Sequence, residues 1–121
     1  MARILVVEDS PTETHQIVNT LARHGHQLLT ASTGLQGLSL AVQQQPDLIL
    51  MDVVMPGLNG FQATRQITKN IETSHIPIII VSSKNQETDR VWGYRQGARG
   101  YLTKPLDDDR LIGAVNEVLG A

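Results

Sequence analysis

The sequence contains no cysteine, which excludes disulfide bonds, thiol catalysis and thiolate zinc sites. It also contains no apolar run near the roughly 18 residues that a membrane-spanning helix requires. Positive charge is not in excess, because ten Lys and Arg stand against twelve Asp and Glu, for a net charge of −2. General affinity for nucleic acid needs a basic surface, so we expect neither a nucleic-acid partner nor a membrane partner.

Features of a second domain or of a secreted protein are also missing. The sequence shows no internal repeat, no low-complexity tract and no linker, and no secretion signal precedes the first strand-like segment, 3–7. A chain of 121 residues with 40% hydrophobic and 18% charged residues is typical of one ordinary domain with its own core. We therefore expect a single soluble, cytoplasmic domain over residues 1–121, without an attached output domain.

The sequence does contain short apolar segments that alternate with helical stretches, a pattern repeated five times. Most of these segments are blocks of Val, Ile and Leu, as expected for parallel strands buried on both faces. The second segment is weaker and suits an edge strand. The pattern predicts an α/β fold in which helices cover both faces of a doubly wound parallel sheet. The expected strands are 3–7, 27–30, 48–51, 77–82 and 100–102.

Short polar signals mark the helix boundaries. Ser10, Pro11 and Glu13 predict an N-cap, a first-turn proline and a capping-box glutamate for the first helix. Gly25 and Gly97 suit left-handed positions after the first and fourth helices. The N-caps expected for the later helices are Thr33, Asn59, Asn85 and Asp107, with Gln36 and Gln62 as capping-box partners of the first two.

Carboxylates follow two of the expected strands. Glu8 and Asp9 come directly after 3–7, and Asp52 comes directly after 48–51. Because the carboxyl ends of parallel strands meet at one edge of the sheet, we expect these three side chains to lie close together. Like charges in a partly buried cleft repel one another, and a hard divalent cation such as Mg²⁺ removes that cost. An acidic pair alone is more simply a solvated loop, but Asp52 at the end of a central apolar strand favours a metal site.

Asp52 is also the candidate nucleophile. An aspartate of this kind accepts a phosphoryl group as an acyl phosphate, in a reaction that needs mainly alignment and charge neutralisation. Ser82 and Lys104 follow the fourth and fifth expected strands, where a hydroxyl and an ammonium can bind phosphoryl oxygens. Each alone has a simpler explanation, as a strand-end hydroxyl bonded to backbone or a solvated loop lysine. Together with the carboxylates, they predict a phosphoryl-transfer site.

Two other kinds of function remain open. A small Mg²⁺-dependent phosphohydrolase of the haloacid-dehalogenase type also uses a strand-end aspartate. Such enzymes usually carry a second carboxylate two residues after the nucleophile, where this sequence has Val54. A binding module that never receives phosphate would have no need for the complete set of carboxylates, hydroxyl and ammonium.

Four short motifs carry a family resemblance: Val7-Glu8-Asp9-Ser10, Met51-Asp52-Val53-Val54-Met55-Pro56-Gly57-Leu58-Asn59-Gly60, Val81-Ser82-Ser83 and Tyr101-Leu102-Thr103-Lys104-Pro105. In this order and spacing they resemble the receiver domain of bacterial two-component response regulators, over the whole chain from Ile4 to the last helix. The resemblance implies a flavodoxin-like fold with strand order 2-1-3-4-5. It also implies a signalling domain that is no enzyme in the usual sense, because it catalyses only its own phosphorylation and dephosphorylation.

The resemblance gives the acidic positions specific roles. Asp52 corresponds to the phosphoacceptor, and Glu8 and Asp9 correspond to the acidic pair that binds Mg²⁺, with Glu8 where many relatives have Asp. The backbone carbonyl of Val54 corresponds to a further protein ligand of the metal, beside the Asp52 carboxylate.

Three further positions have implied roles in switching. Ser82 and Tyr101 resemble the two switch residues, of which the hydroxyl turns toward the phosphate while the aromatic ring moves inward. Lys104-Pro105 resembles the lysine and cis-proline of the family, a cis bond that is tolerable only before proline.

Residues 57–66 and 95–105 are most similar to stand-alone regulators of chemosensory systems that control type IV pili, which implies a role in twitching motility or phototaxis. The implied partners are a sensor histidine kinase and a downstream protein that binds the face formed by helix 4, strand 5 and helix 5. Such a regulator drives a motor or drains phosphate from a shared kinase, as a monomer or weak dimer. Val54 and Lys84 occupy positions that set the phosphoryl lifetime, and Ser83 adds bulk beside the cleft.

Overall fold

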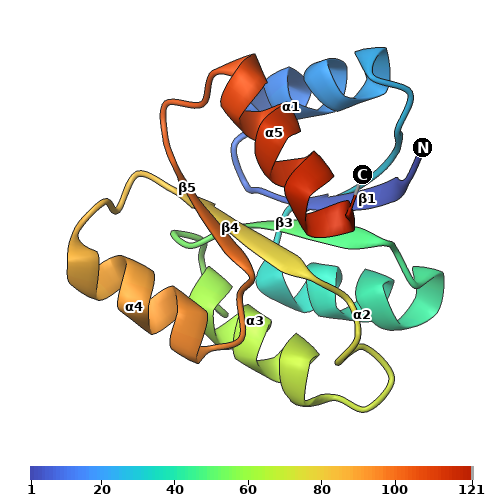
Figure 1. The fold of residues 1–121 in the computed structure, drawn as a ribbon. Coiled ribbons are helices and arrows are strands. Elements are labelled where there is room, and N and C mark those ends of the chain that lie inside the picture. The colour runs from blue at the N-terminus through green and yellow to red at the C-terminus, as the bar shows by residue number, and fades with distance from the viewer. Residues whose placement is uncertain (121) are drawn as a thin grey trace.

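The computed structural model of the protein describes residues 1–120 and shows a five-stranded sheet between two layers of helices (Figure 1). Neighbouring strands are parallel, in the order β2-β1-β3-β4-β5. The strands are β1 (Arg3–Val7), β2 (Gln27–Ala31), β3 (Leu48–Asp52), β4 (Ile78–Ser82) and β5 (Gly100–Thr103). The helices are α1 (Pro11–Arg23), α2 (Gly34–Gln44), α3 (Gly60–Lys69), α4 (Glu87–Arg95) and α5 (Asp108–Leu119). The predicted fold class and strand order are confirmed.

Helices α1 and α5 cover one face of the sheet, and α2, α3 and α4 cover the other (Figure 1). Successive residues of a strand point to opposite faces, so each central strand contributes to two cores. In β1, Ile4 and Val6 pack with α1 and α5, while Leu5 and Val7 pack with α2 and α3. The same alternation decides toward which face the polar side chains at the strand ends point.

The predicted strands agree with the observed ones to within one residue at each end. Strand β2 lies at an edge, as expected, and most of its side chains are exposed or half-buried. Strands β3 and β4 are buried along their whole length, in agreement with their unbroken apolar sequences. Among the described helices, none combines the length and apolar character needed to cross a membrane.

Most of the predicted helix boundaries are confirmed. Side chains of four predicted N-caps accept hydrogen bonds from the backbone three residues later, namely those of Ser10, Thr33, Asn59 and Asp107. Gly25 and Gly97 have φ of +87° and +109° after α1 and α4. The prediction for Asn85 is wrong, because α4 is capped by Gln86. The Asp89 carboxylate accepts the backbone N–H of Gln86 at 3.2 Å, which sets the start of the helix one residue later.

The capping box predicted for α1 does not form. Ser10 Oγ accepts the backbone N–H of Glu13 at 3.3 Å, but the Glu13 carboxylate binds Lys104 Nζ at 2.9 Å instead of returning to Ser10. A carboxylate binds a charged ammonium more strongly than it binds a neutral backbone N–H, which explains why Glu13 binds Lys104 and not Ser10. The Gln36 side chain likewise accepts from Ser32, whereas the box of Asn59 and Gln62 closes as predicted.

Candidate functional site

The register of the sheet brings the ends of four strands to one edge. Val7 is paired with Met51, Asp52 with Val81, and Ser82 with Thr103. Residues directly after these positions therefore meet at the carboxyl edge, which is the ligand-binding edge of open α/β sheets. The side chains predicted to form the phosphoryl-transfer site lie at or directly after this edge, namely those of Glu8, Asp9, Asp52, Ser82 and Lys104.

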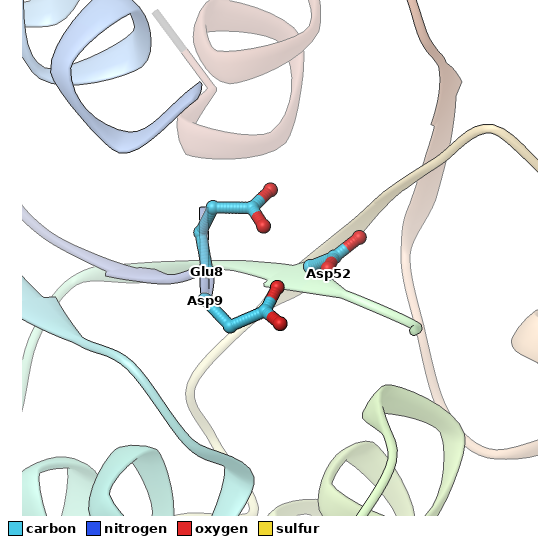
Figure 2. A group of neighbouring side chains, drawn as sticks. All are labelled: Glu8, Asp9 and Asp52. Atoms are coloured by element: carbon cyan, nitrogen blue, oxygen red, sulfur yellow. The ribbon is translucent and has the colours of Figure 1, made fainter. Parts of the chain in front are cut away.

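The carboxylates of Glu8, Asp9 and Asp52 converge there. Each offers an oxygen within 4.8 Å of the others, and Figure 2 shows Glu8 and Asp9 turning from the end of β1 toward the side of Asp52. Glu8 and Asp52 are buried, at 4% and 6% exposure, whereas Asp9 is exposed. The start of α3 packs closely against the backbone at the end of β3, because a side chain at Gly60 would collide with the Asp52 carbonyl oxygen.

Lys104 is the cation of this site. Its Nζ donates to Glu8 Oε1 at 2.8 Å, to Glu13 Oε2 at 2.9 Å and to Asp52 Oδ1 at 3.1 Å. The three carboxylates come from the loop after β1, from the first turn of α1 and from the end of β3. Only 14% of the lysine side chain is exposed, so these ion pairs are shielded from solvent.

Burial and charge shift the pKa values in this cluster. Burial, together with the nearby charge of Asp52, raises the pKa of Glu8 to about 7 in spite of the hydrogen bond from Lys104. Burial alone would lower the pKa of Lys104, but hydrogen bonds to Glu13, Glu8 and Asp52 outweigh that effect and raise it. The lysine thus stays charged, while Glu8 holds a proton more readily than an ordinary glutamate.

These residues fit a divalent cation. Three carboxylates within 4.8 Å of one another supply the hard oxygen ligands that Mg²⁺ prefers, and exposed Asp9 leaves one side open to water. The single ammonium of Lys104 faces the carboxylates of Glu8, Glu13 and Asp52, so the cluster lacks positive charge, which a bound cation would supply. Val54 follows Asp52 by two residues in the loop between β3 and α3, and 60% of the residue is exposed.

Ser82 and Tyr101 lie on the other face of the sheet from Lys104. Ser82 is fully buried, and its Oγ accepts the backbone N–H of Lys84 at 3.1 Å. The Tyr101 hydroxyl donates to the carbonyl oxygen of Lys84 at 2.7 Å, and its ring packs among Val53, Ile80 and Ala98. Both side chains therefore contact the segment between β4 and α4.

The bond between Lys104 and Pro105 is cis, which turns the chain directly after β5. The backbone N–H of Lys104 donates to the Ser82 carbonyl at 2.9 Å and ties this turn to the end of β4.

Sequence reasoning missed two residues of the site. Glu13 was assigned to a capping box, although its carboxylate binds Lys104. Arg90 was not noticed at all, yet its guanidinium lies 5.3 Å from the centre of the Tyr101 ring and donates to Thr103 Oγ1 at 2.9 Å. No local pattern pointed to either contact, because both join segments that are distant in the sequence.

Comparison with known proteins agrees with this geometry. The family model for the response regulator receiver domain matches residues 4–116. The chain therefore belongs to the response regulator receiver domain family, a family of signalling domains.

Three individual proteins are similar to this chain over nearly its whole length. The chain is 62% identical over 119 residues to protein PilH of Pseudomonas aeruginosa, with 98% of each chain covered. The receiver domain of the sensor histidine kinase PA1611 from P. aeruginosa has a TM-score of 0.91 at 31% identity, over 99% of this chain and 98% of that one. That structure has a magnesium ion coordinated in its active-site cleft. The chemotaxis protein CheY4 of Vibrio cholerae has a TM-score of 0.92 at 28% identity, with 98% of each chain covered.

Proposed function

We propose that this protein is a stand-alone response regulator that accepts a phosphoryl group on Asp52 from the phosphohistidine of a sensor kinase. The observation that carries the proposal is the position of Lys104 Nζ, 3.1 Å from Asp52 Oδ1 and 2.8 Å from Glu8 Oε1 at the carboxyl edge of the sheet. A buried nucleophilic carboxylate beside a charged lysine is the arrangement that phosphoryl transfer requires. The similarity to PilH over 98% of both chains supports a domain that acts without an attached output domain.

In this reaction a carboxylate oxygen of Asp52 forms a bond to phosphorus while the bond from phosphorus to the histidine nitrogen breaks. The bonding electrons stay on the imidazole nitrogen, which takes a proton from solvent. Lys104 donates to a phosphoryl oxygen, and the Ser82 hydroxyl, whose oxygen already accepts from Lys84, keeps its own proton to donate to another.

Glu8, Asp9, Asp52 and the backbone carbonyl of Val54 are the groups that would hold Mg²⁺. When bound, the cation neutralises charge on the carboxylates and the transferred group. The convergence of the three carboxylates supports this assignment. The backbone N–H of Gly60 donates to the Val53 carbonyl and not to that of Val54, which leaves the Val54 carbonyl free of this bond.

Phosphorylation would be read out through Ser82 and Tyr101 by a downstream protein. The bond from Tyr101 to the Lys84 carbonyl and that from Lys84 to Ser82 link the site to the start of α4. Helix α4 carries exposed apolar and aromatic side chains, Val91, Trp92 and Tyr94, which are 41–50% exposed. Aromatic residues are favoured in protein interfaces, so a partner that binds α4, β5 and α5 suits this surface.

The resemblance to PilH supports a role in a chemosensory system that controls type IV pili, and thus twitching motility or phototaxis. Within such a system, a cytoplasmic regulator acts either on a motor or as a sink that drains phosphate from a shared kinase. A phosphotransfer time course with the kinase and each of its regulators distinguishes the two. A sink takes phosphate quickly and lowers the amount on the other regulator.

The proposal is tested by incubating the protein with acetyl phosphate and Mg²⁺ and measuring phosphoryl incorporation by intact-protein mass spectrometry. We expect incorporation of at most one phosphoryl group, dependent on Mg²⁺ and absent from Asp52→Asn. The matched control is Asp47→Asn, which makes the same change before the opposite end of β3, where Asp47 accepts the backbone N–H of Arg3 at 2.8 Å. Labelled Asp52→Asn would disprove the assignment, and many turnovers of small phosphoesters per protein would favour a phosphohydrolase.

A further inference from the structure

The ammonium group of Lys104 has no donor to spare. It has three N–H donors, and each has a carboxylate oxygen within 3.1 Å, from Glu8, Glu13 and Asp52. The two glutamate oxygens are the nearer pair, at 2.8 and 2.9 Å, against 3.1 Å for Asp52. A phosphoryl group bound at Asp52 therefore competes for a donor that a glutamate already holds.

The two glutamates differ in what it costs to release them. The Glu8 side chain is 2% exposed, so water cannot replace Lys104 there, and without the lysine or a bound cation the Glu8 charge would be buried and uncompensated, which is costly. The Glu13 side chain is 41% exposed, so water can replace the lysine at little cost. Glu13 is therefore the partner that gives way.

The first turn of α1 holds Glu13 in position for this contact. Ser10 Oγ accepts the backbone N–H of Glu13 at 3.3 Å, which fixes the start of the helix without using the glutamate side chain. The carboxylate is free to reach across to the loop after β5, and it is joined there to a residue 91 positions away in sequence.

We propose that Glu13 is a positioning residue that holds Lys104 in the resting state and competes with the phosphoryl group for it. The proposal rests on the function proposed above. An interaction that is present in the resting state and released in the phosphorylated state shifts the equilibrium toward the resting state by its own free energy. Glu13 thus sets how strongly the site takes up a phosphoryl group, without itself contacting the reacting atoms.

The test is a titration with beryllofluoride, a mimic of the phosphoryl group, in the presence of Mg²⁺ and followed by fluorine magnetic resonance of the bound state. Glu13→Gln keeps the shape of the side chain and removes its charge, so we expect roughly two- to fivefold tighter binding, the range for a partly exposed ion pair. Glu13→Asp keeps the charge but is too short to hold Lys104 in the same way. We expect it to bind beryllofluoride more tightly than the unchanged protein as well.

Glu117→Gln is the matched control, because it removes the same charge from an exposed position on α5, and it should leave binding unchanged. If Glu13→Asp behaves like the unchanged protein while Glu13→Gln binds more tightly, the effect is repulsion through space and competition is disproved. Equal binding by all four proteins also disproves it. Failure of the proposed function looks different, because then the unchanged protein itself shows no Mg²⁺-dependent binding of beryllofluoride and no labelling by acetyl phosphate.

Discussion

The two faces of the sheet at its carboxyl edge hold their polar side chains by different means. On the side of α1, the Lys104 cluster (Glu8, Glu13, Asp52 and Lys104) is held by ion pairs between one ammonium and three carboxylates. On the side of α4, the Tyr101 cluster (Ser82, Lys84, Arg90 and Tyr101) is held by bonds to backbone groups, by apolar packing and by one cation–π contact.

Because of this difference, we expect the two clusters to have different roles. The Lys104 cluster has a deficit of positive charge, so it responds strongly when a charge is added or removed. The Tyr101 cluster depends on contacts that are individually worth about 1 kcal/mol or less, so its alternatives are close in free energy. The first arrangement suits the binding of a cation, and the second suits a conformational switch.

The largest effect is expected from removing the charge of Lys104. Lys104→Met leaves Glu8 and Asp52 buried without a counter-charge, and we expect a loss of about 4 kcal/mol in the free energy of unfolding at pH 8. Urea denaturation measures this loss. Lys69→Met, at an exposed position in the last turn of α3, is the control and should change stability by less than about 0.5 kcal/mol. If Lys104→Met loses no more stability than Lys69→Met, the ion pairs of Lys104 add little to the free energy of unfolding.

The second largest effect is expected from the titration of Glu8, which should make the free energy of unfolding depend on pH. Because the pKa of Glu8 is raised from 4.5 to about 7 in the folded protein, the folded state binds more protons than the unfolded state between these values. The contribution of Glu8 to the free energy of unfolding should therefore fall as pH rises from 4.5 to 7, by up to about 3 kcal/mol at ~1.4 kcal/mol per pKa unit.

Glu8→Gln isolates this contribution, because it removes the titrating group and keeps its shape. Between pH 4.5 and 7, urea denaturation of Glu8→Gln should show a flatter dependence than the unchanged protein. Added Mg²⁺ should reduce the dependence in the unchanged protein, since a bound cation favours the charged carboxylate. If the two proteins have the same slope, Glu8 is not the group that titrates.

A smaller effect is expected in the Tyr101 cluster. Tyr101→Phe removes the hydroxyl that donates to the Lys84 carbonyl. It should lower the free energy of unfolding by about 1 kcal/mol, the usual net contribution of one hydrogen bond. Thermal denaturation measures the cost. Tyr94→Phe, at a residue of α4 that is 49% exposed, is the matched control and should leave stability almost unchanged. A loss as large as that of Lys104→Met would contradict the contrast between the two clusters.

The smallest effect is expected for Arg90. Arg90→Gln removes the cation–π contact with Tyr101 and the bond to Thr103, and it should cost about 0.5–1 kcal/mol in urea denaturation. The control is Arg95→Gln, which is exposed on the same helix. The exposure of Tyr101 should also increase in Arg90→Gln, which quenching of tyrosine fluorescence detects in a variant that lacks Trp92 and Tyr94. Unchanged quenching would show that Arg90 does not hold the ring.

Much of this protein was predictable from local sequence. Blocks such as Leu48–Met51 and Ile78–Val81 are buried on both faces, and residues such as Asn59 and Asp107 cap helices through bonds to the backbone three residues later. These features depend on propensity, periodicity and capping, which involve neighbours in the chain. The convergence of Glu8, Asp9 and Asp52 was also predictable, because parallel strands end at one edge.

Only the tertiary structure decided which of these groups share a partner. Glu8 and Asp9 are adjacent in the sequence, yet one is 4% exposed and the other is open to solvent, because successive residues at a strand end point to opposite faces. The Glu13 carboxylate binds Lys104, which lies 91 positions away, instead of forming the predicted capping box, and the Arg90 guanidinium lies over the ring of Tyr101. Such contacts depend on distances between elements that meet only after packing, so the sequence by itself determined the groups at the site and the fold determined which of them bind one another.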